Sequence, residues 1–235
     1  MRDLYTVKIK DGKATLMSEI PENIKPKRFT SDGRPLPEES NYIDTASAFR
    51  NIQNHFLTQK GKAAKRMYLI WSLGVAGNMR ISDLLTLTWK DFFDDSGNFK
   101  KSFILQGSER HSERVIYITK IMKVSINKYL NNTMPENLSQ KLFYSQKVNN
   151  SAPKVFATRL SKQLGDASEF CGYKRVISYG LKKSFVAIYN QCKNCQCDNL
   201  SHISSLNDNK ELTYYIVPEK ALKEAYELVS NYLLS

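Results

Sequence analysis

The sequence predicts a mainly helical protein with a small antiparallel β-sheet near its middle. Apolar residues recur at helical spacing over most of the chain after residue 45. Two short runs with strand-like composition interrupt this pattern, at 102–106 and 114–119. The chain has 235 residues, of which 41% are hydrophobic and 25% charged, which are ordinary globular values. This length is sufficient for one full domain or two small ones.

The N-terminal region is expected to differ from the rest. Residues 4–20 predict a β-hairpin, because LYTVKIK and KATLMSEI alternate in polarity and Asp11-Gly12 between them is typical of a two-residue turn. Four prolines among polar residues in 21–42 indicate an extended arm. We therefore expect a hairpin and Pro-rich arm over 1–44, followed by the main domain over 45–217.

The main domain is expected to open with helices. Phe49, Ile52 and Phe56 share a helical face, with Thr45 or Ser47 as the N-cap. Residues 62–76 predict a second helix, which is apolar on most sides and therefore buried. A short helix should follow residue 80, and residues 89–93 should lead into the turn DDSGN.

The runs 102–106 and 114–119, joined by a polar loop, predict an antiparallel hairpin. Further helices are expected at 120–131, 152–170, 179–191 and 198–206. A third region, 218–235, should hold an amphipathic helix over 218–234, with Pro218 in its first turn. The apolar face of that helix could pack on its own chain or on a neighbouring protomer, and we lean towards the interface role.

The net charge of the chain indicates the class of its binding partner. The 35 Lys and Arg against 23 Asp and Glu give a net charge of +12, which favours binding to polyanions, nucleic acid before an anionic membrane surface. No apolar run is long enough to span a bilayer, and the first residues lack the pattern of a secretory signal. Four cysteines without such a signal indicate reduced thiols and a cytoplasmic location.

Several separated motifs carry a family resemblance. LIWSLGVAGNMRISDLLTLTWKDF (69–92) resembles the first signature of the tyrosine recombinase, or phage integrase, family. YGLKKSFVAIY (179–189) resembles its His-x-Leu-Arg-Lys segment, and 204–226 resembles the closing stretch that carries the nucleophile. LFYSQK (142–147) stands where members have Leu-Phe-x-Ser. Asn78 replaces a usual Gly, and Asn is well suited to a left-handed turn. The resemblance spans 45–226 and implies a tyrosine recombinase catalytic-domain-like fold.

The resemblance also implies a chemistry. Members cleave DNA by attack of a Tyr hydroxyl on a phosphodiester, forming a 3′-phosphotyrosyl link without a metal or other cofactor. The added negative charge of the transition state needs forked cationic donors. By the resemblance, Arg80 holds the first Arg position and Lys182 the second, where Lys keeps the charge but loses the bidentate fork. Tyr215, or next Tyr214, stands nearest to the nucleophile position.

The remaining family positions depart from the pattern. The general-acid Lys of the hairpin is replaced by Gly107 or Arg110, and Arg is a poor proton donor. Tyr179 stands at the first His, and Asp208 or Asn209 at the second. Each missing acid or base contributes on the order of 10²–10⁴ in rate. We therefore expect a sequence-specific double-stranded DNA-binding protein without cleavage activity, a regulator encoded by a phage or mobile element and acting in a bacterial host cell.

Basic residues flank these positions and are candidates for phosphate contact, which gives affinity rather than sequence choice. The expected DNA-binding residues are Lys60, Lys62, Lys65, Arg66, Arg110, Lys154, Arg159, Lys162, Lys174, Arg175 and Lys183.

Three alternatives stay open at this point. The chain could be an active recombinase or nicking enzyme that uses Tyr215, or an accessory module that joins a full-length recombinase or a second copy through 218–234. A zinc site could be formed by Cys192, Cys195, Cys197 and His202, although their spacing is unusual and we favour free thiols without metal.

Overall fold

The computed structural model describes residues 6–10, 13–17, 41–106, 113–131, 134–143, 153–192 and 219–235. The chain divides into two compact units, Met1–Glu39 and Ser40–Ser235. The first unit holds strand β1 (Thr6–Lys10) and strand β2 (Lys13–Met17), which pair antiparallel up to the closing pair Lys10 and Lys13. The predicted antiparallel pairing of the two strands is thereby confirmed, while the predicted turn residues 11 and 12 and residues 18–40 lie outside the described residues.

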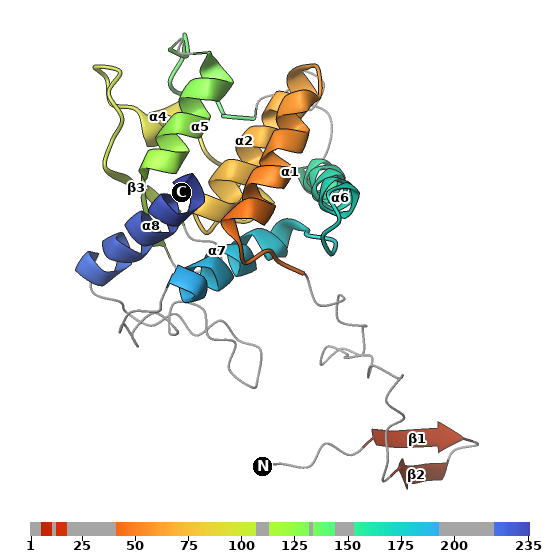
Figure 1. Cartoon of the computed structure of the whole chain (residues 1–235). Helices are drawn as coiled ribbons and strands as arrows, with labels where there is room; N and C mark the ends of the chain where they lie inside the picture. Colours follow the sequence, from red (N-terminus) through yellow and green to blue (C-terminus); the bar gives the residue numbers. More distant parts are fainter. Residues whose placement is uncertain are drawn as a thin grey trace. The chain divides into compact units, whose positions relative to one another are not determined.

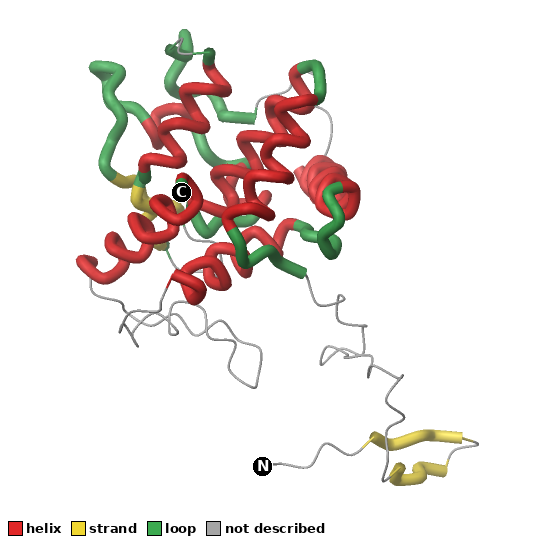
Figure 2. The backbone as a smooth tube through the Cα atoms, viewed as in Figure 1, coloured by secondary structure: helices red, strands yellow, loops and turns green. Residues whose placement is uncertain are grey.

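In the described residues, the second unit is helical apart from one two-stranded sheet (Figures 1 and 2). This confirms the predicted class, mainly α with a small antiparallel sheet. Its elements are α1 (Ala46–Thr58), α2 (Lys62–Ala76), α3 (Ile81–Leu84), α4 (Trp89–Phe92), β3 (Ser102–Leu105), β4 (Arg114–Tyr117), α5 (Lys120–Leu130), α6 (Pro153–Phe170), α7 (Ser178–Cys192) and α8 (Glu219–Leu234).

Helix α2 forms the centre of this unit, and α1, α5 and α7 pack against it (Figure 1). Leu69, Ile70 and Trp71 are fully buried, as expected for a helix that is apolar on most sides. The indole Nε1 of Trp71 donates a hydrogen bond to the carbonyl oxygen of Phe49, 3.0 Å away, which fixes α1 against α2. Gly74 faces Leu181 of α7 so closely that an added Cβ would lie 2.6 Å from that side chain.

Local signals fix several element ends. Thr45, rather than Ser47, caps α1, because its hydroxyl accepts a hydrogen bond from the amide of Ala48 at 3.2 Å. Asn78 follows α2 with φ 52°, so the expected left-handed turn is confirmed.

Helix α4 was not expected from the sequence. Asp91 accepts a hydrogen bond from the amide of Thr88 at 2.7 Å, and the Thr-x-x-Asp spacing is the signal that could have predicted this helix start.

Helix α8 packs on its own chain, against α5 and α7. Ala225, Tyr226, Val229 and Leu233 form its buried face, with at most 2% of each residue exposed. The apolar face of α8 therefore packs on its own chain, whereas we had favoured an interface with a neighbouring protomer. The expected helix over 198–206 lies outside the described residues. None of the helices in the described ranges is long and apolar enough to cross a membrane.

Candidate nucleic-acid interface

Arg80 occupies the N-cap position of α3, directly after the turn that ends α2. Its amide donates a hydrogen bond to Asp83 Oδ2 at 3.0 Å, and its guanidinium Nη2 lies 3.3 Å from Asp83 Oδ1. The next amide, of Ile81, donates to the hydroxyl of Ser178 at 3.0 Å. These bonds fix the start of α3 to the start of α7, so the motifs around residues 80 and 182 meet in the fold.

Arg114 joins the same carboxylate from a different element. It begins β4 and pairs with Leu105 of β3. Paired residues share one face of a sheet, and Leu105 is buried, so the Arg114 side chain lies on the core-facing side of the hairpin. Its Nη2 donates to Asp83 Oδ2 at 2.9 Å. We had not singled out Arg114 from the sequence, although the alternation that puts Ile116 inward also puts Arg114 inward.

Asp83 connects the two arginines and has only 12% of its side chain exposed. Burial by itself would favour the neutral acid. The amide of Arg80 and the guanidiniums of Arg114 and Arg80 outweigh burial, so the pKa of Asp83 is lowered and the carboxylate stays charged. One carboxylate therefore holds two guanidiniums, whose side chains keep 26% and 19% of their surface exposed.

Lys182 of α7 is the third cation of this cluster and is only 6% exposed. Burial, and then the positive charges of Arg114 and Arg80, lower the pKa of Lys182 from 10.5 to about 7, while Asp83 acts in the opposite direction. We call Arg80, Asp83, Arg114 and Lys182 the cationic cluster. Among the described residues, the cluster thus joins three basic side chains and the carboxylate of Asp83.

Tyr226 of α8 lies beside this cluster, buried between Tyr117 and Phe185 at ring-centroid distances of 5.9 and 5.0 Å. Its hydroxyl donates to the carbonyl oxygen of Gly77 at 3.2 Å. Burial raises the pKa of Tyr226 to about 12, against the influence of Arg114. Its packing and this hydrogen bond hold the phenol in place.

Several predicted site residues are not brought to the cluster by the described part of the chain. Arg110, Asp208 and Tyr215 lie outside the described residues, as do Gly107, Asn209 and Tyr214. Tyr179 is half-buried at the start of α7, with Lys183 Nζ 5.6 Å above its ring.

The predicted DNA-binding residues fall into distinct surroundings. The side chains of Lys60, Lys62, Lys65, Arg159, Lys162 and Lys174 are exposed, and that of Lys183 is half-exposed. Lys154 belongs to α6, but its side chain is not described. Arg66 is half-buried with its guanidinium 5.2 Å from the centre of the Phe156 ring, and burial lowers its pKa.

Arg175 is held by carboxylates of α6. Its Nη2 lies 2.9 Å from Asp166 Oδ1, and its Nη1 donates to Glu169. Both carboxylates are about half exposed, and together they raise the pKa of Arg175. Because two carboxylates flank this single guanidinium, the positive charge at the end of α6 is neutralised locally. This weakens the prediction that Arg175 contacts DNA.

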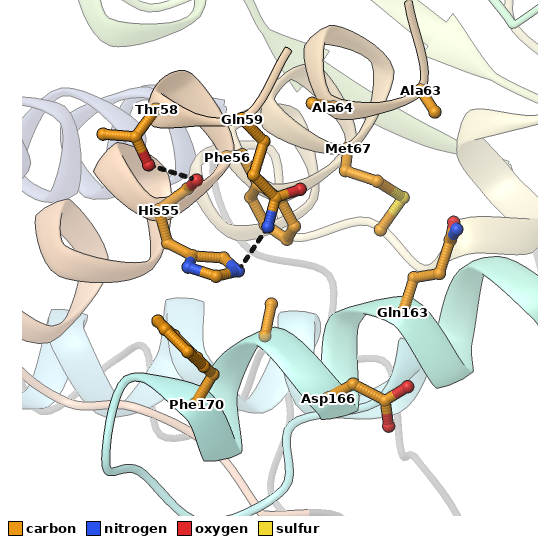
Figure 3. A pocket seen from close by; sticks show the side chains of 11 residues that line it. His55, Phe56, Thr58, Gln59, Ala63, Ala64, Met67, Gln163, Asp166 and Phe170 are labelled. Atoms are coloured by element: carbon orange, nitrogen blue, oxygen red, sulfur yellow. Dashed lines mark hydrogen bonds between the residues drawn. The ribbon is translucent and has the colours of Figure 1, made fainter. Parts of the chain in front are cut away.

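A pocket of about 610 Å³ lies between α1, α2 and α6 (Figure 3). The rings of His55 and Phe170 face each other at 4.6 Å, and Phe170 is 77% exposed. No Lys or Arg occurs among the described residues that line the pocket, and its one acidic residue is Asp166. This composition suits an apolar contact and not a phosphate group.

No group of three or more His, Cys, Asp or Glu arranged to hold a metal ion occurs within the described ranges. Of the alternative zinc ligands, Cys192 ends α7, and burial raises the pKa of its thiol. Cys195, Cys197 and His202 lie outside the described residues.

Comparison with solved structures finds likenesses to two recombinases. The crystal structure of XerA recombinase matches with a TM-score of 0.48 and 15% identity, over 88% of this chain and 63% of that chain. XerH site-specific recombinase bound to its difH substrate matches with a TM-score of 0.46 and 14% identity, over 84% and 55%. This chain thus spans less than two thirds of either protein. No protein-family model and no curated protein matches this chain.

Proposed function

We propose that this protein binds double-stranded DNA sequence-specifically on a tyrosine recombinase-like scaffold, without cleaving it, as a repressor-like regulator of a phage or mobile element. The observation that carries the proposal is the cationic cluster. Arg80 and Arg114 share one carboxylate at 3.3 and 2.9 Å, and Lys182 lies beside them, in a chain with a net charge of +12.

A phosphodiester suits this cluster better than other anions do. Guanidiniums donate in a planar fork that matches two phosphate oxygens, and a half-buried site strengthens such contacts relative to water. The predicted basic residues on α2 and α6 would extend the contact along a duplex, because their exposed ammonium and guanidinium groups can each neutralise a further phosphate.

The absence of cleavage is inferred from the chemistry of the motifs. The family positions for two histidines and a hairpin lysine carry other residue types here: Tyr179, Asp208 or Asn209, and Gly107 or Arg110. Tyr226, the tyrosine packed beside the cluster, is neutral and buried. A protein that binds its DNA site without cutting it acts by occupying that site, which is how a repressor works.

Selection from a random duplex library tests this proposal. We expect the purified protein to enrich a defined motif and to bind it with an affinity that falls steeply with salt. Binding that is salt-dependent but enriches no motif would contradict sequence specificity. Weak binding that is equal at low and high salt would contradict DNA binding itself.

An active strand-transfer enzyme is the second candidate, and Lys182 favours it. With a pKa of about 7, this lysine can release a proton at neutral pH, as a general acid must do for a leaving 5′-oxygen. Incubation with a nicked suicide duplex that carries the selected site tests for a covalent adduct. An adduct that Tyr215→Phe abolishes and Tyr214→Phe retains would establish this second candidate and contradict the first.

A further inference from the structure

Arg66 of α2 differs from Arg114 and Arg175 in its partners. Its guanidinium lies 5.2 Å from the centre of the Phe156 ring of α6, and its buried Nε has no hydrogen-bond partner in the described part of the chain. Arg114 and Arg175 each pair with a carboxylate at 2.9 Å, whereas no carboxylate of the described residues forms an ion pair with Arg66. The ring attracts the cation but supplies no lone pair to its N–H groups.

The helices around Arg66 carry no acidic residue near it. Helices α2 and α5, which pack against each other, contain no Asp or Glu. On α6 the first acidic residue is Asp166, about 15 Å along the helix from Phe156 at 1.5 Å per residue. Burying a cation without an anionic partner costs free energy. An anionic ligand is therefore the partner that would stabilise Arg66 in these surroundings.

Two further hydrogen-bond donors lie near Arg66. Arg159 is exposed and follows Phe156 by three residues on α6, so the two side chains are neighbours on one face of that helix. Tyr129 of α5 is half-buried, with its ring 6.0 Å from that of Trp89, and we had not singled it out from the sequence. Burial raises the pKa of Tyr129 while Arg66 acts in the opposite direction, so the hydroxyl keeps its proton and can donate.

We infer that Arg66, Arg159 and Tyr129 form a phosphate-binding site that is separate from the cationic cluster. Arg66 lies in the second turn of α2, whereas Arg80 follows the end of that helix. Phe156 packs against the Arg66 guanidinium, and the planar fork of each guanidinium matches two phosphate oxygens. The inference rests on the proposed function, because a phosphodiester of the duplex is the expected source of the phosphate.

Fluorescence anisotropy with a mixed-sequence duplex, over a range of NaCl concentrations, tests the site. For Arg66→Gln we expect about a tenfold loss of affinity at low salt. Because Arg66 and Arg159 share one phosphate, Arg66→Gln/Arg159→Gln should decrease the slope of log K against log salt by about 0.9, whereas two independent phosphates would give about 1.8. Tyr129→Phe should weaken binding about fivefold and keep the slope, because the hydroxyl carries no charge.

Two matched controls and a second ligand complete the experiment. Arg50→Gln of α1 and Tyr232→Phe of α8 change half-buried residues outside the site. Thermal unfolding in sodium phosphate and in NaCl of equal ionic strength tests for binding of the free ion, since a ligand of the folded state raises the melting temperature. Stabilisation by phosphate that Arg66→Gln loses would show that the site also takes free phosphate.

The outcomes separate the inference from the proposed function. If the unmodified protein does not bind the duplex in a salt-dependent way, the proposed function fails and the phosphate measurement alone decides the inference: equal melting temperatures in the two salts would overturn it. If the protein binds and Arg66→Gln and Tyr129→Phe match the controls, the proposed function stands and Arg66 only packs on Phe156. A slope decrease of 1.8 in the double variant would overturn the shared site. Should Arg66→Gln not fold, Tyr129→Phe and Arg159→Gln decide.

Discussion

Two clusters of this protein combine arginines and carboxylates in opposite ratios. In the cationic cluster, Arg80 and Arg114 share the one carboxylate of Asp83, which is 12% exposed. At the end of α6, the single guanidinium of Arg175 is shared by two carboxylates, 54% and 51% exposed. The first region has one buried carboxylate between two guanidiniums, and the second has two half-exposed carboxylates around one guanidinium.

The comparison shows that two arginines of one chain can lie in opposite electrostatic surroundings. Arg114 and Arg175 both make ion pairs within the chain, so the presence of a pair does not distinguish them. What distinguishes them is how many carboxylates each cation shares and how deeply these are buried, since burial strengthens an electrostatic interaction and solvent screens it.

The largest effect should come from removing both forks of the cationic cluster. In Arg80→Gln/Arg114→Gln we expect affinity for a duplex at moderate salt to fall by about 100-fold and the salt slope to decrease by about 1.8, since two phosphate contacts are lost. Anisotropy titrations measure both quantities. The control Arg50→Gln/Lys90→Gln removes the same charge from outside the cluster, and an equal loss there would show that net charge alone matters.

The next largest effect should be a dependence of duplex affinity on pH, caused by the titration of Lys182. Without DNA its pKa is about 7, and a bound phosphate raises it, so binding takes up a proton and affinity falls as the pH rises above 7. Between pH 6 and pH 8.5 we expect a decrease of about tenfold. Lys182→Arg keeps the charge without titrating in this range, so a pH dependence unchanged in that variant would assign the effect to another group.

The free energy of unfolding should rise with pH, whereas the affinity for DNA should fall. The unfolded chain keeps the proton of Lys182 up to its ordinary pKa of 10.5, whereas the folded chain loses it near 7. Between these values the unfolded state binds more protons, so the contribution of Lys182 to the free energy of unfolding rises with pH. Denaturation of the DNA-free protein and of Lys182→Met, compared across this range, measures that contribution.

A smaller effect, an increase in duplex affinity, should follow when the carboxylates that pair with Arg175 are removed. In Asp166→Asn/Glu169→Gln the guanidinium loses both carboxylates, and we expect a few-fold gain in duplex affinity with a rise of up to about 0.9 in the salt slope. Asp95→Asn/Glu136→Gln changes the net charge equally at exposed positions elsewhere. Equal gains in the two variants would mean that the local pairing of Arg175 has no influence on binding.

The smallest effect is expected from Arg175→Gln in the unmodified background. Because its charge is already balanced by Asp166 and Glu169, its removal should leave the salt slope within experimental error. The same anisotropy titration measures it. A decrease near 0.9 would return Arg175 to the DNA-binding residues that the sequence suggested and would remove the contrast between the two clusters.

Much of the fold could be predicted because its signals are local. The pairing of β1 with β2, the apolar periodicity of α2 and α8 and the left-handed Asn78 each depend on a few neighbouring residues. Helix α4 was missed because four residues are too few for periodicity, so only its capping residues indicate it.

The proximity of Arg80 and Lys182 in the candidate site could be predicted for the same reason. Arg80 and Lys182 belong to sequence motifs, and the fold brings them together. Arg114 belongs to no motif, and its role depends on a contact with Asp83, 31 residues away, that only the tertiary structure creates. The neutralisation of Arg175 depends likewise on how the chain returns to α6 after that helix ends.

The register of the β3–β4 hairpin carries a consequence for how the site assembles. Its outer face shows the pair Ile104 and Val115, which are 54% and 37% exposed, while Arg114 points inward. A slip of β4 by one residue would exchange these faces, placing Val115 where the guanidinium stands and separating Arg114 from Asp83. The Arg114–Asp83 ion pair therefore favours the native register of the strands, and the same register completes the cationic cluster.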